Sequence, residues 1–411
     1  MHLHDVLIAG AGPAGAAVAA RLHQHGIRDV VVLDRYDFPR DKPCGGGLTG
    51  HADEAFAALD LTLRVPFVPS KIAHVRCGTF DRSVTLGRPV NVIRRIEFDA
   101  DLVAQVRDRG VEITTGEGVT AVAPDREGVT VRTSRGRELR AKIVVGADGA
   151  ASIVRKHLIG DRALPHRLFM RELPRPAGLD LGAGAPMLYD FTPMARGVRG
   201  YLWVFPAPGD RINVGIMHYP AFRAGGPALL DVLRTRLDEL GIELPARHNL
   251  GWPVWGYHPR TPVSAPRLVT VGDAAGIDGL TGEGIAVAME QAQIAGDAIA
   301  RALASGNVGF RGYRRALRKA VVGRELALDR WLAKLLYRSP RWRSWLSLVL
   351  YDPDVLELYA ARVDGTQVLA DQKLRLWGAL WRHARKAGVR RRELAAALPE
   401  AVRMLPPGAA S

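Results

Sequence analysis

Cysteine is scarce in this chain, because only Cys44 and Cys77 occur among its 411 residues. Two thiols exclude a disulfide framework, a cysteine-based zinc site and a cysteine-ligated iron–sulfur cluster. Long apolar runs are also missing, since no stretch approaches the roughly 20 residues that a membrane-spanning helix needs. The first apolar strand pattern begins at about Asp5, so we expect no signal peptide. These features together predict a cytoplasmic protein.

Metal-ligand spacings are absent as well. The 12 histidines, His2 and His4 among them, show no pattern typical of a metal site, so we expect no metal. Acidic residues are fewer than basic ones, with 42 Asp and Glu against 57 Lys and Arg. The chain is otherwise globular in composition, with 47% hydrophobic and 24% charged residues, and is long enough for two or three domains.

The basic excess is concentrated at the end of the chain. Residues 311–411 hold 21 Lys and Arg against 9 Asp and Glu, and five of the eight tryptophans: Trp331, Trp342, Trp345, Trp377 and Trp381. Basic residues interleaved with Trp and Leu favour peripheral contact with an anionic membrane. A solvated helical domain explains the same composition equally well. No nucleic-acid fold signature accompanies the charge, so we expect no nucleic-acid partner.

Residues 5–34 have the pattern of a dinucleotide-binding βαβ unit. An apolar run, Val6–Ala9, leads into a glycine-rich turn and an Ala-rich helix, and a second apolar run, Val30–Leu33, ends in Asp34. The turn contains Gly10, Gly12, Pro13, Ala14 and Gly15. Its glycines allow a tight turn, close approach to a pyrophosphate and close helix–strand packing. Asp34 is placed to accept hydrogen bonds from a ribose diol, which favours FAD or NAD over NADP.

Two further segments follow the same strand–loop–helix order. The buried run Ile143–Val145 leads to Asp148 and Gly149, and the run Leu268–Val271 leads to Gly272, Asp273 and the glycine-rich stretch to Ile285. Each loop alone is compatible with an ordinary turn. Together they predict one nucleotide-binding domain built from distant segments, with a sheet domain inserted between them.

These three loops resemble those of the FAD-dependent oxidoreductases of the para-hydroxybenzoate hydroxylase-like superfamily, where the second and third are the DG and GD motifs. The resemblance implies that Asp273 holds the ribityl chain of FAD. It also implies that Gly282, Gly284 and Ile285 place a helix N-terminus at the flavin pyrimidine edge. By the same resemblance, Asp148 and Arg155 would support the pyrophosphate and an approaching nicotinamide cofactor. The segment Arg95–Leu102 recurs in the family too.

Two more segments narrow the resemblance to geranylgeranyl reductases. Residues 38–48, FPRDKPCGGGL, are similar to the PxxKxCGG segment of that family, and Tyr201–Pro206, YLWVFP, to its YxWxFP motif. The likeness covers about the first 310 residues, with Gly279 standing where the GD loop usually has proline. It predicts a catalytic set of Cys44, Tyr201 and Trp203, and adds Arg35, Cys44, Gly45 and Arg95 to the residues that bind FAD.

Several of these side chains have a second interpretation. Tyr201, Trp203 and Phe205 alternate along a strand and share a face, either as an aromatic wall beside flavin and an isoprenoid chain or as core. Cys44 either assists proton delivery or fills a small apolar space, and Cys77 is better explained as core. Glu283 is better explained as a cap in the first turn of a helix than as an acid catalyst.

The activity implied is reduction of carbon–carbon double bonds in a polyprenyl chain by hydride from reduced FAD. The alternative is an FAD-dependent monooxygenase or halogenase that uses O₂, although halogenases usually carry WxWxIP where this chain has YLWVFP. A second dinucleotide fingerprint is absent from the sequence, so NADPH bound at the surface or a small redox protein would supply electrons. An isoprenoid or lipid is the expected substrate, and the oligomeric state stays open.

The predicted fold is α/β, with a Rossmann-like FAD-binding domain from residues 1–60, 93–160 and 264–310. A β-sheet substrate domain takes residues 61–92 and 161–263, and 311–411 form a helical region. Local patterns add a helix over 52–62, strands at Ile72–Cys77 and Ser83–Leu86, and a helix from about Phe98 to Gly110.

Overall fold

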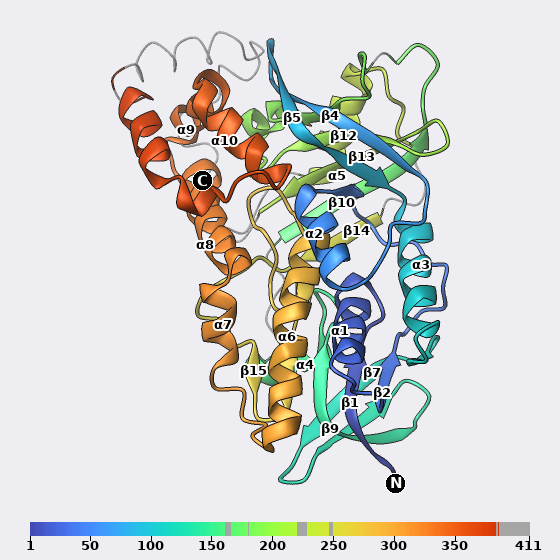
Figure 1. Cartoon of the computed structure of the whole chain (residues 1–411). Coiled ribbons are helices and arrows are strands. Elements are labelled where there is room, and N and C mark those ends of the chain that lie inside the picture. The colour runs from blue at the N-terminus through green and yellow to red at the C-terminus, as the bar shows by residue number, and fades with distance from the viewer. Residues whose placement is uncertain (161–165, 180, 220–227, 246–249, 384, 386–411) are drawn as a thin grey trace.

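The structure is a computed structural model that describes residues 1–160, 166–179, 181–219, 228–245, 250–383 and 385. Two eight-stranded sheets lie at opposite ends of it, the first beside the N-terminus in Figure 1. Helices α1 (Pro13–Gln24) and α6 (Ile285–Ser305) pack side by side next to the first sheet. The fold is therefore the mixed α/β architecture that the sequence predicts.

The first sheet brings three distant loops to one edge. Its strand order is β15-β16-β9-β1-β2-β6, with β8 on β9 and β7 on β8. Strands β16, β9, β1, β2 and β6 are parallel to their neighbours in this order, so their carboxyl ends meet at the same edge. The bounds are β1 (Leu3–Ala9), β2 (Val30–Leu33), β6 (Glu112–Thr114), β7 (Val119–Pro124), β8 (Val129–Thr133), β9 (Glu138–Gly146), β15 (Ser264–Ala265) and β16 (Leu268–Thr270).

The second sheet has the order β14-β10-β13-β12-β11-β4-β5-β3 and is antiparallel except where β11 pairs with β4. The bounds are β3 (Gly47–Leu48), β4 (Phe67–Cys77), β5 (Phe80–Ile93), β10 (His166–Pro174), β11 (Met187–Asp190), β12 (Leu202–Ala207), β13 (Arg211–His218) and β14 (Leu250–Val254). Its first strand, β3, comes from the range assigned to the FAD-binding domain and pairs with β5. The glycine-rich segment before β3 is thereby joined to both sheets.

Four local predictions had wrong bounds. The helix predicted over 52–62 is α2 (Gly50–Ala58), and the two short strands predicted after it are parts of the longer β4 and β5. The helix predicted from Phe98 is α3 (Arg95–Arg107). Its first turn was missed because a polar Arg95–Asp99 ion pair, rather than an apolar side chain, fixes it.

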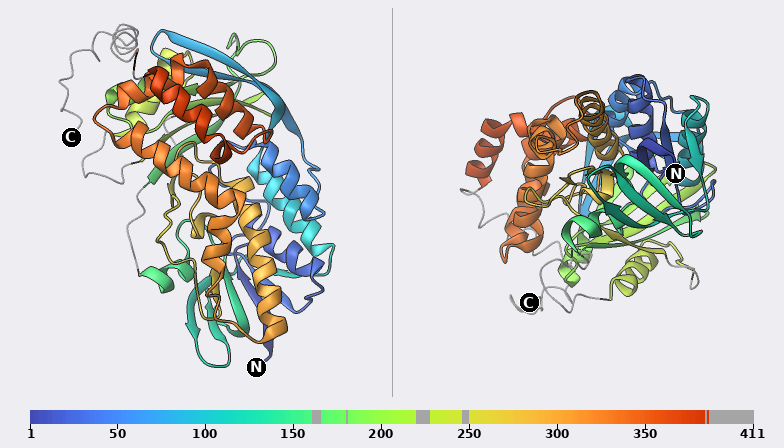
Figure 2. Two further views of the ribbon diagram at one scale, coloured as in Figure 1. Left: turned by 60° about the vertical axis from the view of Figure 1, so that its left-hand side comes forward. Right: turned by 90° about the horizontal axis from the view of Figure 1, so that it is seen from below.

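The C-terminal helices share a core with the second sheet. They run along one side of the molecule from the first sheet to the second (Figure 2), and α10 packs on β5. The bounds are α7 (Tyr313–Lys319), α8 (Val321–Ala333), the π-helix η3 (Lys334–Arg338), α9 (Trp342–Tyr351) and α10 (Pro353–Val363), and a further helix covers 373–383. Among the described residues, no helix is long and apolar enough to cross a bilayer.

Two further α-helices pack on the sheets, and short 3-10 helices lie at η1 (Thr192–Arg196), η2 (Gly272–Ala274) and η4 (Leu369–Asp371). Helix α4 (Ile153–Ile159) follows β9 and packs against the first sheet, and α5 (Leu229–Glu239) packs against β13 of the second. The N-cap of α4 is Ser152, whose side chain accepts a hydrogen bond from the backbone N–H of Arg155 at 3.0 Å.

Candidate functional site

A cavity of about 620 Å³ extends from the carboxyl edge of the first sheet to the C-terminal helices. This volume lies in the range of roughly 300–1,000 Å³ that is usual for small-molecule sites. One end is lined by the loops after β1, β2, β9 and β16. The other end is apolar and is lined from the second sheet and the C-terminal helices by Met187, Met217, Leu336, Trp345, Val349 and Leu356.

The turn after β1 fits a dinucleotide. Gly10 has φ of 101°, and a Cβ there would lie 2.4 Å from the carbonyl oxygen of Ala147. A Cβ on Gly15 would lie 1.8 Å from the carbonyl oxygen of Gly10, so the close approach of α1 to the turn requires glycine. The cavity here is lined by Gly10, Gly12, Pro13, Ala14, Asp34 and Arg35. The N-terminus of α1 thus presents backbone N–H groups to this end of the cavity.

Asp34 ends β2 and is held against the same turn. Its Oδ2 accepts a hydrogen bond from the backbone N–H of Ala11 at 2.8 Å, and Oδ1 accepts one from Tyr36 at 3.0 Å. A carboxylate has about four acceptor sites, so these two bonds leave capacity for a ribose diol. The geometry is compatible with the role that the sequence predicts for Asp34.

Asn213 of β13 joins two of the predicted motifs. These are the glycine-rich loop over 38–48, which precedes and includes β3, and the aromatic motif Tyr201–Pro206. The Asn213 side chain accepts a hydrogen bond from the Trp203 indole at 2.8 Å and donates one to the Cys44 carbonyl at 2.8 Å. A Cβ on Gly45 would lie 3.2 Å from the Phe205 ring, so the loop rests directly on the aromatic strand. Cys44 and Gly45 both line the cavity.

Arg95 lies beneath this loop in a buried ion pair. Its Nε and Nη2 each donate to the Asp99 carboxylate at 2.7 Å, and Arg40 adds a contact to the same carboxylate at 3.1 Å. Burial alone would lower the pKa of Arg95, but Asp99 raises it, so the guanidinium stays charged. Arg95 borders the cavity, and its bidentate pairing positions it there.

Asp148 and Arg155, to which the sequence analysis gave one shared role, have different surroundings in the loop after β9 and the helix that follows it. Asp148 lines the cavity, and its Oδ2 accepts a hydrogen bond from the backbone N–H of Ile153 at 2.7 Å. Burial raises the pKa of Asp148 above its usual value. Arg155 is not among the residues that line the cavity: its guanidinium lies 4.4 Å from the centroid of the Trp255 ring and donates to the Ala150 carbonyl. Contact between Arg155 and a pyrophosphate stays a prediction.

The GD loop also lines the cavity, and Gly272 lies next to Ala14 at the start of α1. Gly272 has φ of 61° and donates its N–H to Gln291 Oε1 at 2.8 Å. Asp273 faces the cavity and pairs with Lys42 of the glycine-rich loop at 3.2 Å. The N-terminus of α6 follows, and Gly282, Gly284 and Ile285 line the cavity in front of it. This arrangement presents a helix dipole to whatever occupies the space.

The aromatic motif forms one face of the apolar end. Tyr201, Trp203 and Phe205 all line the cavity, with neighbouring ring centroids 6.1 and 6.4 Å apart. The Tyr201 hydroxyl donates to the Thr281 carbonyl, which ties this strand to the GD loop. The three side chains are thus both a cavity wall and part of the second core. The second cysteine, Cys77, is fully buried in that core, and burial raises its pKa to about 12.

Comparison with known proteins agrees with this geometry. Residues 4–167 match the family model described as FAD binding domain. The chain is 30% identical over 324 residues to digeranylgeranylglycerophospholipid reductase 2 of Methanothermobacter thermautotrophicus, which covers 75% of this chain and 80% of that protein. It belongs to the geranylgeranyl reductase family of FAD-dependent oxidoreductases. Its cofactor is therefore FAD, and it is an enzyme.

Two further relatives extend the likeness over most of the chain. A menaquinone reductase of Mycolicibacterium smegmatis is 28% identical over 409 residues, covering 91% of this chain and 95% of that protein. A geranylgeranyl bacteriochlorophyll reductase-like protein of Thermoplasma acidophilum has the same fold, with a TM-score of 0.71 at 19% identity over 91% of this chain and 100% of that chain. The likeness to these two proteins thus covers more of the chain than the first 310 residues, which carry the motifs.

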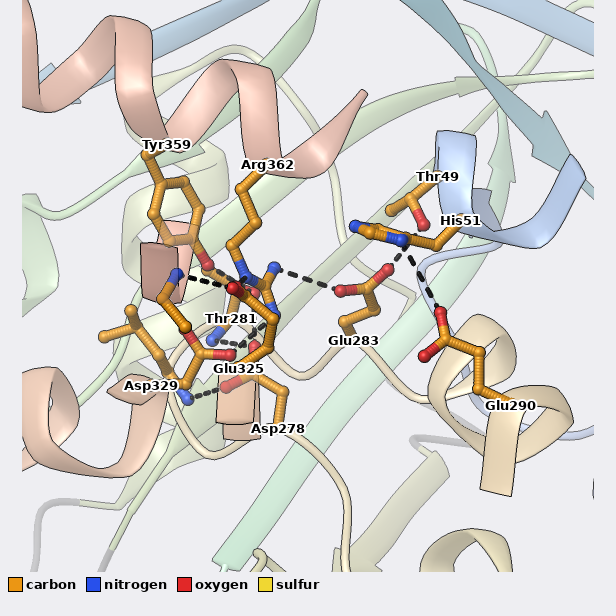
Figure 3. A network of polar contacts seen from close by, with 12 residues as sticks. Thr49, His51, Asp278, Thr281, Glu283, Glu290, Glu325, Asp329, Tyr359 and Arg362 are labelled. Carbon is orange, nitrogen blue, oxygen red and sulfur yellow. Dashed lines mark hydrogen bonds and ion pairs between the residues drawn. The ribbon is translucent and has the colours of Figure 1, made fainter. Parts of the chain in front are cut away.

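One polar network of this geranylgeranyl reductase-type enzyme was missed by sequence reasoning. Arg362 of α10 lies among three carboxylates: Nη1 is 3.0 Å from Glu283, Nε is 2.8 Å from Glu325, and Nη2 is 2.5 Å from Asp329. Thr49 donates its hydroxyl to the other oxygen of Glu283 (Figure 3). Arg362 and Glu283 both line the cavity. The network therefore ties the C-terminal helices to the GD loop.

The prediction that Glu283 caps a helix was wrong. Helix α6 begins at Ile285, and the Glu283 side chain points away from it toward Arg362 (Figure 3). Nearby, His51 Nδ1 lies 3.5 Å from Glu290, whose pKa burial and the neighbouring Glu283 raise to about 8. Burial also raises the pKa of Asp329 well above its usual value, although Arg362 opposes this.

Two histidines also group in a way that their spacing did not suggest. His2 and His4 lie 2.9 and 2.7 Å from the two oxygens of Asp29, near the amino end of β1. Asp29 precedes β2, so the pairing of two parallel strands makes this contact rather than local sequence. His2, His4 and Asp29 lie at the amino ends of their strands, whereas the cavity lies at the carboxyl ends.

Replacing Asp273 with alanine should weaken FAD retention on the order of tenfold or more, since a charge-assisted hydrogen-bond acceptor at the cavity wall is lost. Asp273→Asn keeps the shape and should lose less. The ratio of flavin to protein absorbance after dialysis measures both. Asp125→Ala, in an exposed turn that pairs with Arg140, is the control and should retain FAD fully. A yellow, fully loaded Asp273→Ala protein would contradict the assignment.

Proposed function

We propose that this enzyme reduces carbon–carbon double bonds of a polyprenyl chain, of the geranylgeranyl type, held in the apolar end of the cavity. The observation that supports the proposal is the continuity of that cavity. One cavity is lined by the FAD cradle, which is formed by the loops after β1, β2, β9 and β16, by Cys44 and Trp203, and by aliphatic and aromatic side chains. A flexible hydrocarbon chain gains free energy by leaving water for such a space, at roughly 25 cal/mol per Å² of buried apolar area.

The chemistry requires hydride and a proton at neighbouring carbons. Reduced FAD supplies the hydride when bound. An unconjugated alkene is a poor hydride acceptor, so the protein must exclude water and place the double bond where a proton donor reaches it. The apolar lining from the second sheet and the C-terminal helices excludes water, and the buried Trp203–Asn213–Cys44 hydrogen bonds hold the loop that borders the double bond.

Cys44 is our candidate for assisting protonation. Cys44→Ser should slow alkene reduction at least tenfold while leaving the rate of flavin reduction unchanged, because only the former step needs the proton. Stopped-flow absorbance of the flavin separates the two steps. Cys77→Ala removes a buried thiol that does not line the cavity and should change neither rate. If both steps of Cys44→Ser match those of the wild type, Cys44 has no role in catalysis.

The substrate and the electron donor are proposed from the same features. The names of the relatives point to lipids, so we propose an isoprenoid lipid taken from the cytoplasmic face of an anionic membrane through residues 311–411. The sequence has one dinucleotide fingerprint, which FAD occupies. We therefore propose that NADPH binds at the surface, or that a small redox protein docks there, to deliver electrons.

Mass spectrometry of a geranylgeranyl lipid incubated with the chemically reduced enzyme tests the activity. Gain of hydrogen pairs without air supports the prenyl reductase. No change without air, together with gain of an oxygen atom in air, would assign the enzyme to the monooxygenases instead. Gain of a halogen, with halide present in air, would assign it to the halogenases.

A further inference from the structure

The helix over 373–383 presents apolar side chains on two sides. Leu376 and Leu380, one turn apart, line the cavity. Leu374, Trp377 and Trp381 are spaced by three and four residues and are 88%, 65% and 59% exposed. The helix is therefore a wall of the cavity on one side and an apolar stripe on the outer surface on the other.

This outer stripe is a concentration of exposed hydrophobic residues. Eight large hydrophobic residues are exposed in the described part of the chain, and three of them are in this helix. A fourth, Trp331 of α8, is 42% exposed and also lines the cavity. With Val321 at the start of α8, five of the eight exposed large hydrophobic residues lie on these two helices. Contiguous exposed apolar surface of this kind marks an interaction site.

Charge around the stripe identifies the kind of partner. Residues 373–385 contain four Lys and Arg and no acidic residue. The Arg385 guanidinium lies 3.9 Å from the centroid of the Trp381 ring, which places a cation directly at the apolar stripe. Beside Trp331, the pKa of Lys334 is lowered, first by Arg330 and also by Arg338 and Arg260, so positive charges crowd there too. An anionic surface is complementary to these positive charges.

Tryptophan next to Lys and Arg is the combination that anchors helices in the headgroup layer of a bilayer. Arg375 and Arg382 attach the helix to the start of α10, since both pair with Asp354 and Arg382 also pairs with Asp352 at 3.2 Å. The helix is therefore held in place while its tryptophans and remaining cations face outward. A protein partner would not account for the fact that the same helix also lines an apolar cavity.

We propose that the helix over 373–383, together with Trp331, docks on an anionic bilayer and that the prenyl chain of a lipid enters the cavity past Leu376 and Leu380. This inference rests on the proposed function, which makes the substrate a lipid. It goes further by locating the docking surface and the entrance. Docking by these residues would place the entrance of the cavity against the hydrocarbon boundary, so the chain never crosses water.

Vesicle sedimentation tests the docking surface with the full-length holoenzyme. Wild type should sediment with vesicles of phosphatidylcholine and phosphatidylglycerol, and much less with phosphatidylcholine alone or at high salt. Trp377→Ala/Trp381→Ala should lower partitioning on the order of tenfold or more, since two aromatic anchors are lost. Phe67→Ala removes an exposed aromatic from β4, away from the cavity, and should partition as wild type does.

The docking surface and the proposed activity can be tested separately by presenting one prenyl lipid either in detergent micelles or in anionic vesicles. The double variant should reduce a prenyl lipid in detergent micelles at the wild-type rate but be at least tenfold slower when the lipid is in anionic vesicles. Wild type that fails in micelles would refute the proposed function whatever the sedimentation result. Wild type that stays in the supernatant, or a double variant that matches it in both assays, would overturn the docking surface.

Discussion

Replacing Arg362 with methionine is expected to lower the free energy of unfolding by about 3–5 kcal/mol, because it leaves three buried carboxylates without their shared cation. Glu283, Glu325 and Asp329 all lie within 3.0 Å of its guanidinium. Methionine is an unbranched apolar side chain that fills much of the space of the arginine stem. The loss of stability therefore measures the missing charge more than a missing volume. Urea unfolding followed by circular dichroism, at fixed FAD concentration, gives the difference.

Two further variants make this result specific. Arg362→Lys should also be destabilised, because one ammonium cannot reproduce three hydrogen bonds from a planar guanidinium. Arg382→Met removes an arginine that also bonds two carboxylates, Asp352 and Asp354, but is largely exposed, and should have a much smaller effect. Equal midpoints for Arg362→Met and Arg382→Met would mean that the cluster is solvated and does not hold the C-terminal helices to the GD loop.

Gly15→Ala is expected to weaken FAD binding on the order of a hundredfold. The new Cβ would lie 1.8 Å from the Gly10 carbonyl oxygen, so α1 must move away from the turn, and overpacking of this kind costs about 1–3 kcal/mol. Helix propensity alone favours alanine over glycine by about 1 kcal/mol. If propensity decided the outcome, Gly15→Ala would stabilise α1, whereas the steric clash predicts that it destabilises the turn. Fluorescence titration of the apoprotein with FAD measures the affinity.

Gly312→Ala provides the matched control, since a Cβ at Gly312 meets no atom within 4 Å and its backbone is not left-handed. Its FAD affinity should equal that of wild type. An unchanged affinity for Gly15→Ala would show that the turn has room for a methyl group, and would remove the steric argument for glycine at this position of the cradle.

The sequence alone located the FAD cradle, because the residues that build it are tied to local backbone geometry. A tight turn after a buried strand needs glycine whatever surrounds it, so the three loops after β1, β9 and β16 were visible as patterns of glycine, aspartate and apolar runs. The same reasoning could not rank residues within a loop. It grouped Asp148 with Arg155, and only packing against Trp255 shows that Arg155 does not line the cavity.

The extent of the cavity was decided by the tertiary structure. The C-terminal helices carry no motif, so composition could describe them only as basic and rich in tryptophan. In the fold, Trp342 is buried, Trp345 lines the cavity, and Trp377 and Trp381 are exposed. Identical side chains in one region thus have different roles, because burial depends on which neighbouring element covers each helix face.

The sequence by itself determined the family, the FAD cofactor and the positions of the glycine-dependent turns, since these follow from interactions between residues close in the chain. Only the tertiary structure decided that Asn213 joins the glycine-rich loop to the aromatic strand and that Glu283 pairs with Arg362, 79 residues away. Such contacts leave no periodic or local signal. They arise when two sheets and a set of helices close around one space, and burial then requires each enclosed charge to find a partner.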